Sequence, residues 1–272
     1  IADVIGYPEY SPPNLNTQGV KAQPDWLFNF FKHPEVVRPN LQVKMPSFNF
    51  TDDEWTSIIK AFQHMENHNS LIESDYEVEL TNDFSKLKYE AGKFIYELGE
   101  CSKCHFGATQ SDGSNGVAEG DPSTWAPNLG LSKERLRHDW IVEWLANPQE
   151  IMPGTKMPAP YIPGSLDEAL SLRAAEGGDA IANFAQYIID NHNSDYDLFK
   201  QLLLEGVRDN IYLLDDYKNV DDYIKNHFNN NDYDFLRPSK KPTDDVDDLD
   251  DEEDWDDEED WDDEEDWDDD WE

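Results

Sequence analysis

The chain has 272 residues, of which 38% are hydrophobic, so it is long enough for one large domain or two small ones. Its formal net charge of −40 argues against nucleic acids and anionic membrane surfaces as partners and favours a basic protein partner or divalent cations. No stretch approaches about 18 consecutive apolar residues, so no transmembrane segment is predicted.

The N-terminal region, residues 1–66, contains a loop in which Met45 stands between a lysine and a proline. An extended loop of this kind is one way in which a methionine is presented to a haem iron. The region has no cysteine, and His33, late in the first helix, is expected at the surface rather than as a ligand. Helices are predicted on both sides of the loop, over residues 25–31 and 52–65.

The next predicted helix ends at the one chemical motif of the chain. Its apolar residues recur at 3.6-residue spacing: Leu87, Ala91, Phe94, Ile95 and Leu98. The motif Cys-x-x-Cys-His follows, formed by Cys101, Cys104 and His105. Two thiols at this spacing can add across the vinyl groups of a porphyrin, and the histidine then points its imidazole at the iron.

Two other interpretations of the motif fit the sequence less well. A thioredoxin-like dithiol should follow a strand, whereas a helix is predicted before Cys101. Half of a zinc site would need two more soft ligands, and the chain has only two cysteines. The sequence therefore favours c-type haem.

Further elements follow in a fixed order after the motif. Residues 126–129 read Ala-Pro-Asn-Leu, and a helix is then expected from Asp139 as N-cap to Asn147. Its apolar face carries Trp140, Ile141, Trp144 and Leu145. A loop over residues 151–160 contains two methionines that each precede a proline. The last helix is expected over residues 179–190, with Ile181, Phe184, Ala185 and Ile188 facing inward.

These elements resemble class I cytochrome c over residues 82–191. The resemblance implies an all-α fold around one covalently bound haem c. By this resemblance Cys101 and Cys104 carry the thioethers, and Leu129 and Trp140 line the haem pocket. His105 and Met157 would bind the iron, and the Pro127 carbonyl would accept a hydrogen bond from His105. Met152 is the competing methionine, but the family places the ligand after Pro-Gly, which selects Met157.

An internal repeat relates the N-terminal region to the haem domain. The matched positions are Pro13 with Pro127, Asp25 with Asp139, Trp26 with Trp140, Phe30 with Trp144, Pro34 with Pro148 and Met45 with Met157. Residues 1–66 are therefore expected to be the distal half of a second cytochrome c-like domain. In that domain Met45 would be the iron ligand, and Pro13 would be the acceptor for a histidine. One apolar wall is expected from Leu15, Trp26, Leu27, Phe30 and Phe48.

Three interpretations of this half-domain remain open. The favoured one places a second Cys-x-x-Cys-His upstream of Ile1, in residues that precede this chain or were removed from it. It would give the protein a second haem, which would cover the apolar wall. In the second interpretation the domain has lost its haem and kept its packing. In the third, another chain completes the fold.

The remaining segments are predicted to carry no chemistry of their own. Residues 67–81 form a polar linker, residues 193–243 a helical extension packed on the haem domain, and residues 244–272 an acidic tail. The tail repeats DDEEDW three times and is expected to be disordered. It either solvates the protein or attracts a basic redox partner.

The predicted function is electron transfer rather than catalysis, because histidine and methionine would occupy both axial positions of the iron. The protein would serve a respiratory electron-transfer complex as a subunit or as its redox partner. Family machinery attaches haem c outside the cytoplasm, so an extracytoplasmic location is expected. The alternative is a haem enzyme or gas sensor in which Met157 leaves the iron; His138, its one candidate acid or base, is expected to be exposed.

Overall fold

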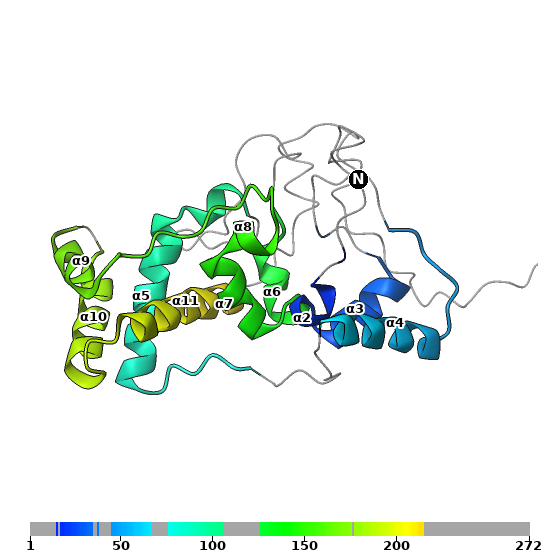
Figure 1. Ribbon diagram of the computed structural model, residues 1–272, viewed down its shortest axis with the longest axis horizontal. Coiled ribbons are helices and arrows are strands. Elements are labelled where there is room, and N and C mark those ends of the chain that lie inside the picture. The colour runs from blue at the N-terminus through cyan, green and yellow to red at the C-terminus, as the bar shows by residue number, and fades with distance from the viewer. Residues whose placement is uncertain are drawn as a thin grey trace, which may run out of the picture. The chain divides into compact units, whose positions relative to one another are not determined.

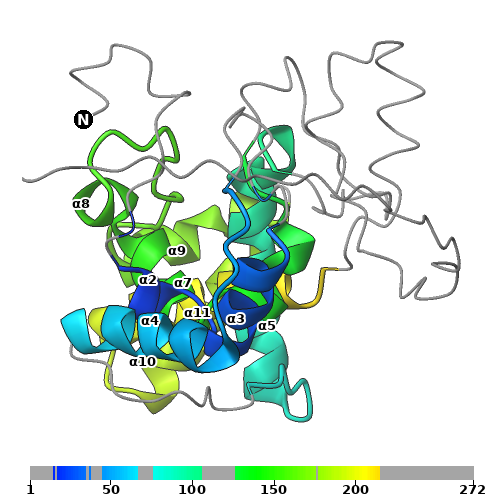
Figure 2. The same cartoon turned by 90° about the vertical axis from the view of Figure 1, so that its right-hand side faces the viewer.

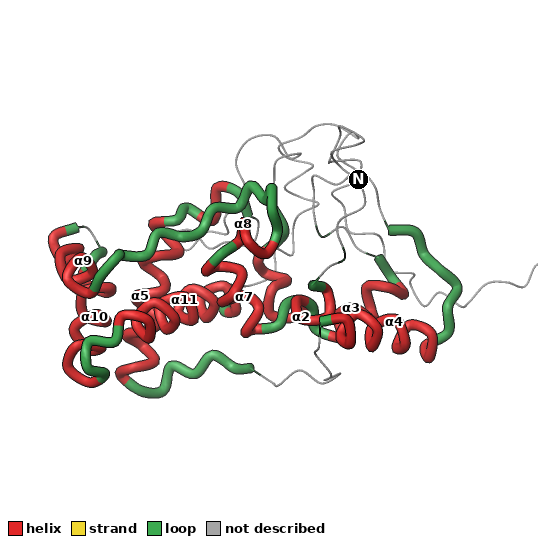
Figure 3. The backbone as a smooth tube through the Cα atoms, in the orientation of Figure 1, coloured by secondary structure: helices red, strands yellow, loops and turns green. Residues whose placement is uncertain are grey.

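Helices form all of the regular secondary structure in the part of the chain that the structure describes, as Figure 3 shows. The computed structural model describes residues 15, 17–34, 37, 45–66, 76–105, 126–175 and 177–214, within one compact unit that spans residues 1–239. No strand occurs among these residues, so the predicted all-α class is confirmed for them. None of the helices in these ranges is both long enough and apolar enough to cross a membrane.

The helices predicted from the sequence occur in the predicted order with small differences at their ends, and four short helices of four to six residues were not predicted. The helices are α2 (Gln18–Lys21), α3 (Pro24–Lys32), α4 (Asp52–Met65), α5 (Asp83–Leu98), α6 (Ser132–Arg135), α7 (His138–Ala146), α8 (Pro148–Ile151), α9 (Leu166–Ser171), α10 (Asp179–Asn191) and α11 (Tyr196–Tyr212), with 3₁₀ helices η2 (Cys101–Lys103), η4 (Leu129–Leu131) and η5 (Leu172–Ala174). The expectation of Asp139 as N-cap was wrong, because Arg137 holds that position. Asp139 lies in the first turn instead, where its charge still favours the positive end of the helix dipole.

The main hydrophobic core is built from residues of α5, α7, α10 and α11, whose ribbons can be followed in Figure 1. The four residues of α10 that were predicted to face inward are fully buried. Helix α11 adds Phe199, Leu203 and Val207 to the same core, so this part of the expected extension packs together with α5, α7 and α10. The extension beyond residue 214 and the whole acidic tail lie outside the described residues.

The buried face of α5 differs at one end from its predicted face. Ala91 and Ile95 are buried as expected, but Leu98 is 49% exposed. The inward stripe includes Tyr96 instead. The buried stripe of α5 ends at Tyr96, because every residue from Glu97 to Glu100 is exposed.

Helices α5 and α11 cross at two glycines. A Cβ atom on Gly92 would lie 2.0 Å from the carbonyl carbon of Gly206, and one on Gly206 would lie 2.3 Å from the carbonyl oxygen of Lys88. Only residues without side chains permit so close an approach. The crossing brings the C-terminal helix directly against the helix that carries the Cys-x-x-Cys-His motif.

The N-terminal helices α2, α3 and α4 pack around a second apolar cluster, and Figure 2 shows them side by side. Phe31 of α3 stacks on Trp55 of α4 at 5.0 Å between ring centroids. Helix α4 begins at a reciprocal capping box between Thr51 and Glu54. The expected apolar wall is only partly formed, because Leu15 is 56% exposed and Phe48 is 48% exposed. The cluster is closed by α4 rather than by these two side chains.

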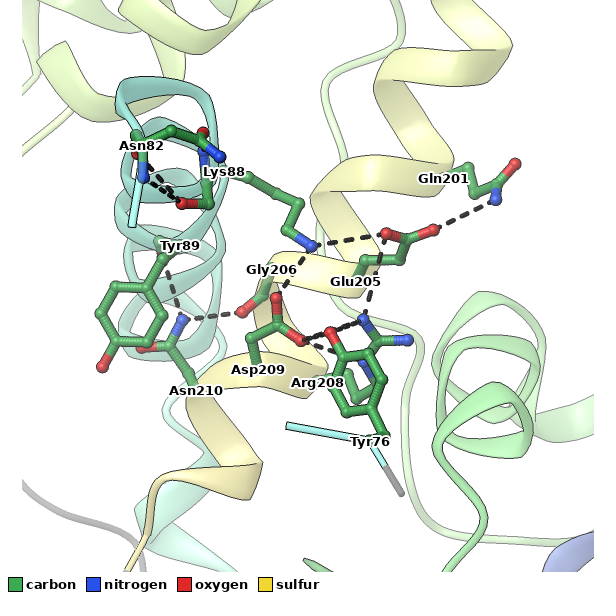
Figure 4. A network of polar contacts seen from close by, with 11 residues as sticks. Tyr76, Asn82, Lys88, Tyr89, Gln201, Glu205, Gly206, Arg208, Asp209 and Asn210 are labelled. Carbon is green, nitrogen blue, oxygen red and sulfur yellow. Dashed lines mark hydrogen bonds and ion pairs between the residues drawn. The ribbon is translucent and has the colours of Figure 1, made fainter. Parts of the chain in front are cut away.

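A buried polar network fastens α11 to α5 and to the segment before it, as Figure 4 shows. Asp209 lies at its centre: its Oδ2 is 2.9 Å from Lys88 Nζ, and its Oδ1 accepts hydrogen bonds from Tyr76 at 2.7 Å and from Arg208 at 2.9 Å. Burial raises the pKa of the Tyr76 hydroxyl, and the bond to Asp209 adds to the rise. The network balances the Asp209 carboxylate with two cations, as a buried charge requires.

The segment assigned to the linker takes part in this packing. Tyr76 stacks on the His138 ring at 4.8 Å between centroids, and the His138 side chain is only 15% exposed. His138 was predicted to be exposed, and that prediction was wrong. Sequence periodicity does not show that a residue from a polar linker returns to cover the start of α7.

Substitution of Tyr76 by phenylalanine is expected to lower the free energy of unfolding by about 1–3 kcal/mol, because it removes a hydrogen bond to a buried charge. Tyr161→Phe is the matched control, since this hydroxyl also donates to a carboxylate, Glu168, but at an exposed site. The control should change stability by less than about 0.5 kcal/mol. Urea denaturation of both variants measures the difference, and equal effects would contradict the assignment of the network as stabilising.

Candidate functional site

The Cys-x-x-Cys-His motif forms a single tight turn at the end of α5. Glu100 takes a left-handed backbone conformation with φ of 49°, and η2 begins directly after it at Cys101. The His105 backbone N–H closes the turn by donating to the Cys101 carbonyl at 3.0 Å. Both cysteines are free thiols; Cys101 is half-buried and Cys104 is exposed. Burial raises the pKa of the Cys101 thiol to about 11. The turn therefore presents two unpaired thiols directly before an imidazole.

The His105 ring is held by the hydrogen bond that the sequence predicted. Its Nδ1 lies 2.7 Å from the Pro127 carbonyl oxygen, and the Ala126 backbone N–H donates to the Cys104 carbonyl at 2.7 Å. In the tautomer that donates Nδ1–H to Pro127, the lone pair lies on Nε2. Loss of hydration lowers the pKa of His105, which favours the neutral form of the ring. A neutral imidazole with this second partner is the form that binds a metal.

Met157 is held in place by a side chain of α7. Its Sδ accepts a hydrogen bond from Trp144 Nε1 at 2.8 Å, and Trp144 stacks on the buried Trp140 at 5.2 Å between centroids. Met157 packs against the main core, as do Cys101 and Leu129. Met152 is half-buried at the end of α8, where its N–H donates to the Pro148 carbonyl at 2.9 Å.

Tyr96 is a residue of this site that the sequence analysis did not select. Its hydroxyl is buried and has no hydrogen-bond partner among the described residues. Burial raises its pKa, and the nearby Cys101 contributes to the rise, so the hydroxyl lies close to that thiol. A buried donor without a partner is rare and costly. It fits a site completed by a further group with acceptor atoms, such as a haem. The only signal in the sequence was its place five residues before Cys101, in the last turn of α5.

The donor set also bears on the zinc interpretation. Across the described ranges, no three His, Cys, Asp or Glu side chains come together as a metal cage. An iron held by one imidazole and one thioether needs no such cage, because a porphyrin supplies its other four ligands. The residues present fit that group.

The N-terminal region repeats the distal half of this arrangement. Helices α2 and α3 correspond in length and position to α6 and α7 along the matched sequence. Trp26 stacks on Phe30 at 4.7 Å, as Trp140 stacks on Trp144. Met45 is half-buried and packs against the second cluster. His33 is exposed, as predicted, and Pro13 lies outside the described residues.

Comparisons with known proteins leave the chain without an assigned family. No family model, no curated protein and no solved structure matches it.

Proposed function

We propose that residues 82–192 bind one haem c and that the protein transfers electrons through it. The observation that carries this proposal is the geometry of the motif turn. Two free thiols stand within one turn of His105, and the Pro127 carbonyl already orients the imidazole through Nδ1, which leaves Nε2 for the iron. The haem would supply a one-electron couple between Fe(II) and Fe(III).

Each side chain has a distinct task in this proposal. The thiols of Cys101 and Cys104 would hold the haem covalently, each by a thioether formed by addition across one vinyl group, with the thiol hydrogen passing to the adjacent carbon and nothing released. His105 Nε2 and Met157 Sδ would bind the iron. Trp144 holds the Met157 sulfur by its indole N–H, and the sulfur keeps a second lone pair for the metal. An iron bound by both residues would be closed to a substrate, which supports electron transfer rather than catalysis.

The partners and the location follow from the same proposal. With a net charge of −40, the protein suits a basic redox protein or a respiratory complex that exposes a basic face. Covalent attachment of haem supports an extracytoplasmic site. If the protein also contains a second attachment motif, the repeat supports a second haem. Met45 would be its distal ligand, and the Pro13 carbonyl would accept a hydrogen bond from its histidine.

Covalent attachment is tested by producing the full chain together with haem c maturation machinery. We expect one haem per chain that stays bound after denaturation, because thioether bonds survive unfolding. The variant with both Cys101 and Cys104 changed to serine should lose it completely, since the chain has no other cysteine. Absorbance of the denatured protein and metal analysis give the result. Stoichiometric zinc without covalent pigment would reject the proposal.

A further inference from the structure

The two repeats contact each other along a short antiparallel stretch of backbone. Ala22 and Leu136, which occupy equivalent positions of the repeat, form an isolated bridge and are both buried. Beside it the Gln23 N–H donates to the Arg135 carbonyl at 2.9 Å, and the equivalent bond with the two repeats exchanged has the same length. Residues 21–23 and 135–137 are called the junction below. Its pairing of equivalent residues gives it the pseudo-twofold symmetry of an isologous interface.

Gln23 makes three hydrogen bonds across the junction. In addition to its backbone N–H, its side-chain Nε2 donates to the Leu136 carbonyl at 2.9 Å and to the Lys133 carbonyl at 2.6 Å. The Leu136 carbonyl also accepts a hydrogen bond from the Tyr212 hydroxyl of α11, at 2.9 Å. The peptide group that joins α6 to α7 is therefore held from two sides, by the N-terminal repeat and by the C-terminal helix.

The segment held at Leu136 contacts both of the proposed iron ligands. Near its start, the Pro127 carbonyl oxygen lies 2.7 Å from His105 Nδ1. Near its end, Trp144 of α7 donates to Met157 Sδ at 2.8 Å. Leu136 directly precedes the N-cap of α7, so the junction fixes the start of the helix that presents Trp144 about two turns later.

The position of α7 bears on how readily Met157 could leave a haem iron. Departure of this ligand would be a local opening, whose free energy depends on how firmly the surrounding segment is held. An external ligand such as imidazole binds Fe(III) only in the open form, so its apparent affinity rises with the population of that form. A helix fastened at its start keeps Trp144 against the Met157 sulfur. Loosening of the junction would therefore favour the open form.

We propose that the junction positions α7 so that Met157 stays on the haem iron, and that Gln23 is a positioning residue for this ligand although it lies in the other repeat. The N-terminal repeat thereby keeps the site closed to external ligands. This role does not require a second haem in the N-terminal repeat. The inference rests on the proposed function, because it requires haem with Met157 as a ligand.

The test measures the affinity of imidazole for Fe(III) in haem-loaded full-chain variants by absorbance titration. Gln23→Met keeps the length of the side chain and removes its two hydrogen bonds. Gln23→Pro also removes the backbone N–H, and it fits the backbone because φ is −66° here and Ala22 is already extended. We expect the affinity to rise about threefold to tenfold in Gln23→Met and further in Gln23→Pro, since each lost bond weakens the junction.

Thr51→Ala is the matched control. It removes the capping box of α4 and so destabilises the same repeat away from the junction. The affinity for imidazole should change by less than about twofold in this variant. Unchanged affinity in both Gln23 variants, or an equal rise in Thr51→Ala, would overturn the inference.

Two further outcomes have a defined meaning. If Gln23→Pro fails to load haem, the affinity of Gln23→Met alone decides. Absence of covalent haem, or of the Met–Fe(III) band, from the unmodified chain would instead refute the proposed function, before any variant is compared.

Discussion

Replacement of Met157 by alanine is expected to abolish the charge-transfer band of the Met–Fe(III) bond and to open the iron to carbon monoxide. The thioether is the proposed sixth ligand, and alanine offers no donor atom in its place. The reduction potential should also fall, because thioether ligation favours Fe(II). Visible and near-infrared spectra of the oxidised protein, followed by carbon monoxide titration of the reduced protein, measure both effects.

Met152→Ala is the matched control for this experiment. Met152 is also followed by proline and lies in the same loop region, but the tryptophan hydrogen bond goes to Met157. The control should keep the band and remain closed to carbon monoxide. The opposite outcome, with the band lost in Met152→Ala and kept in Met157→Ala, would mean that Met152 and not Met157 is the iron ligand.

Gly92→Ala is expected to destabilise the protein by about 3 kcal/mol or more, at the upper end of the cost of overpacking a core. The added Cβ would lie 2.0 Å from a backbone carbon of α11, which cannot rotate away as a side chain would. Helices α5 and α11 must therefore separate, and Phe199, Leu203 and Val207 would lose contacts in the core. Such a loss is a large part of the roughly 5–15 kcal/mol that stabilises a typical domain.

Whether Gly92→Ala lowers or raises stability distinguishes the effect of the helix crossing from that of intrinsic helix propensity. In an uncrowded helix, glycine to alanine gains about 1 kcal/mol, so a loss can come only from the contact with α11. Gly164→Ala serves as control, because its Cβ would meet only the flexible end of Glu168, at 3.2 Å. Urea unfolding followed by circular dichroism gives both values. A Gly92→Ala variant as stable as the control would mean that the two helices do not approach this closely.

The pattern of apolar residues was enough to predict helices that bury one face against the core. The buried faces of α10 and most of α5 follow from 3.6-residue spacing, and the order of the helices follows from their capping residues and prolines. The hydrogen bond between His105 and Pro127 was predicted from the family resemblance and is present. Leu98 and His138 were misplaced, because burial at a helix end depends on what packs there from elsewhere in the chain.

By itself, the sequence determined the Cys-x-x-Cys-His turn, the repeat and the helical class, because each depends on residues close together in the chain or on spacing that recurs along it. Only the tertiary structure decided that α11 meets α5 at Gly206, that Trp144 holds Met157, and that Arg135 is buried against Trp26. These contacts join residues on separate elements. Their partners are selected by the packing of the whole core, which no local pattern specifies.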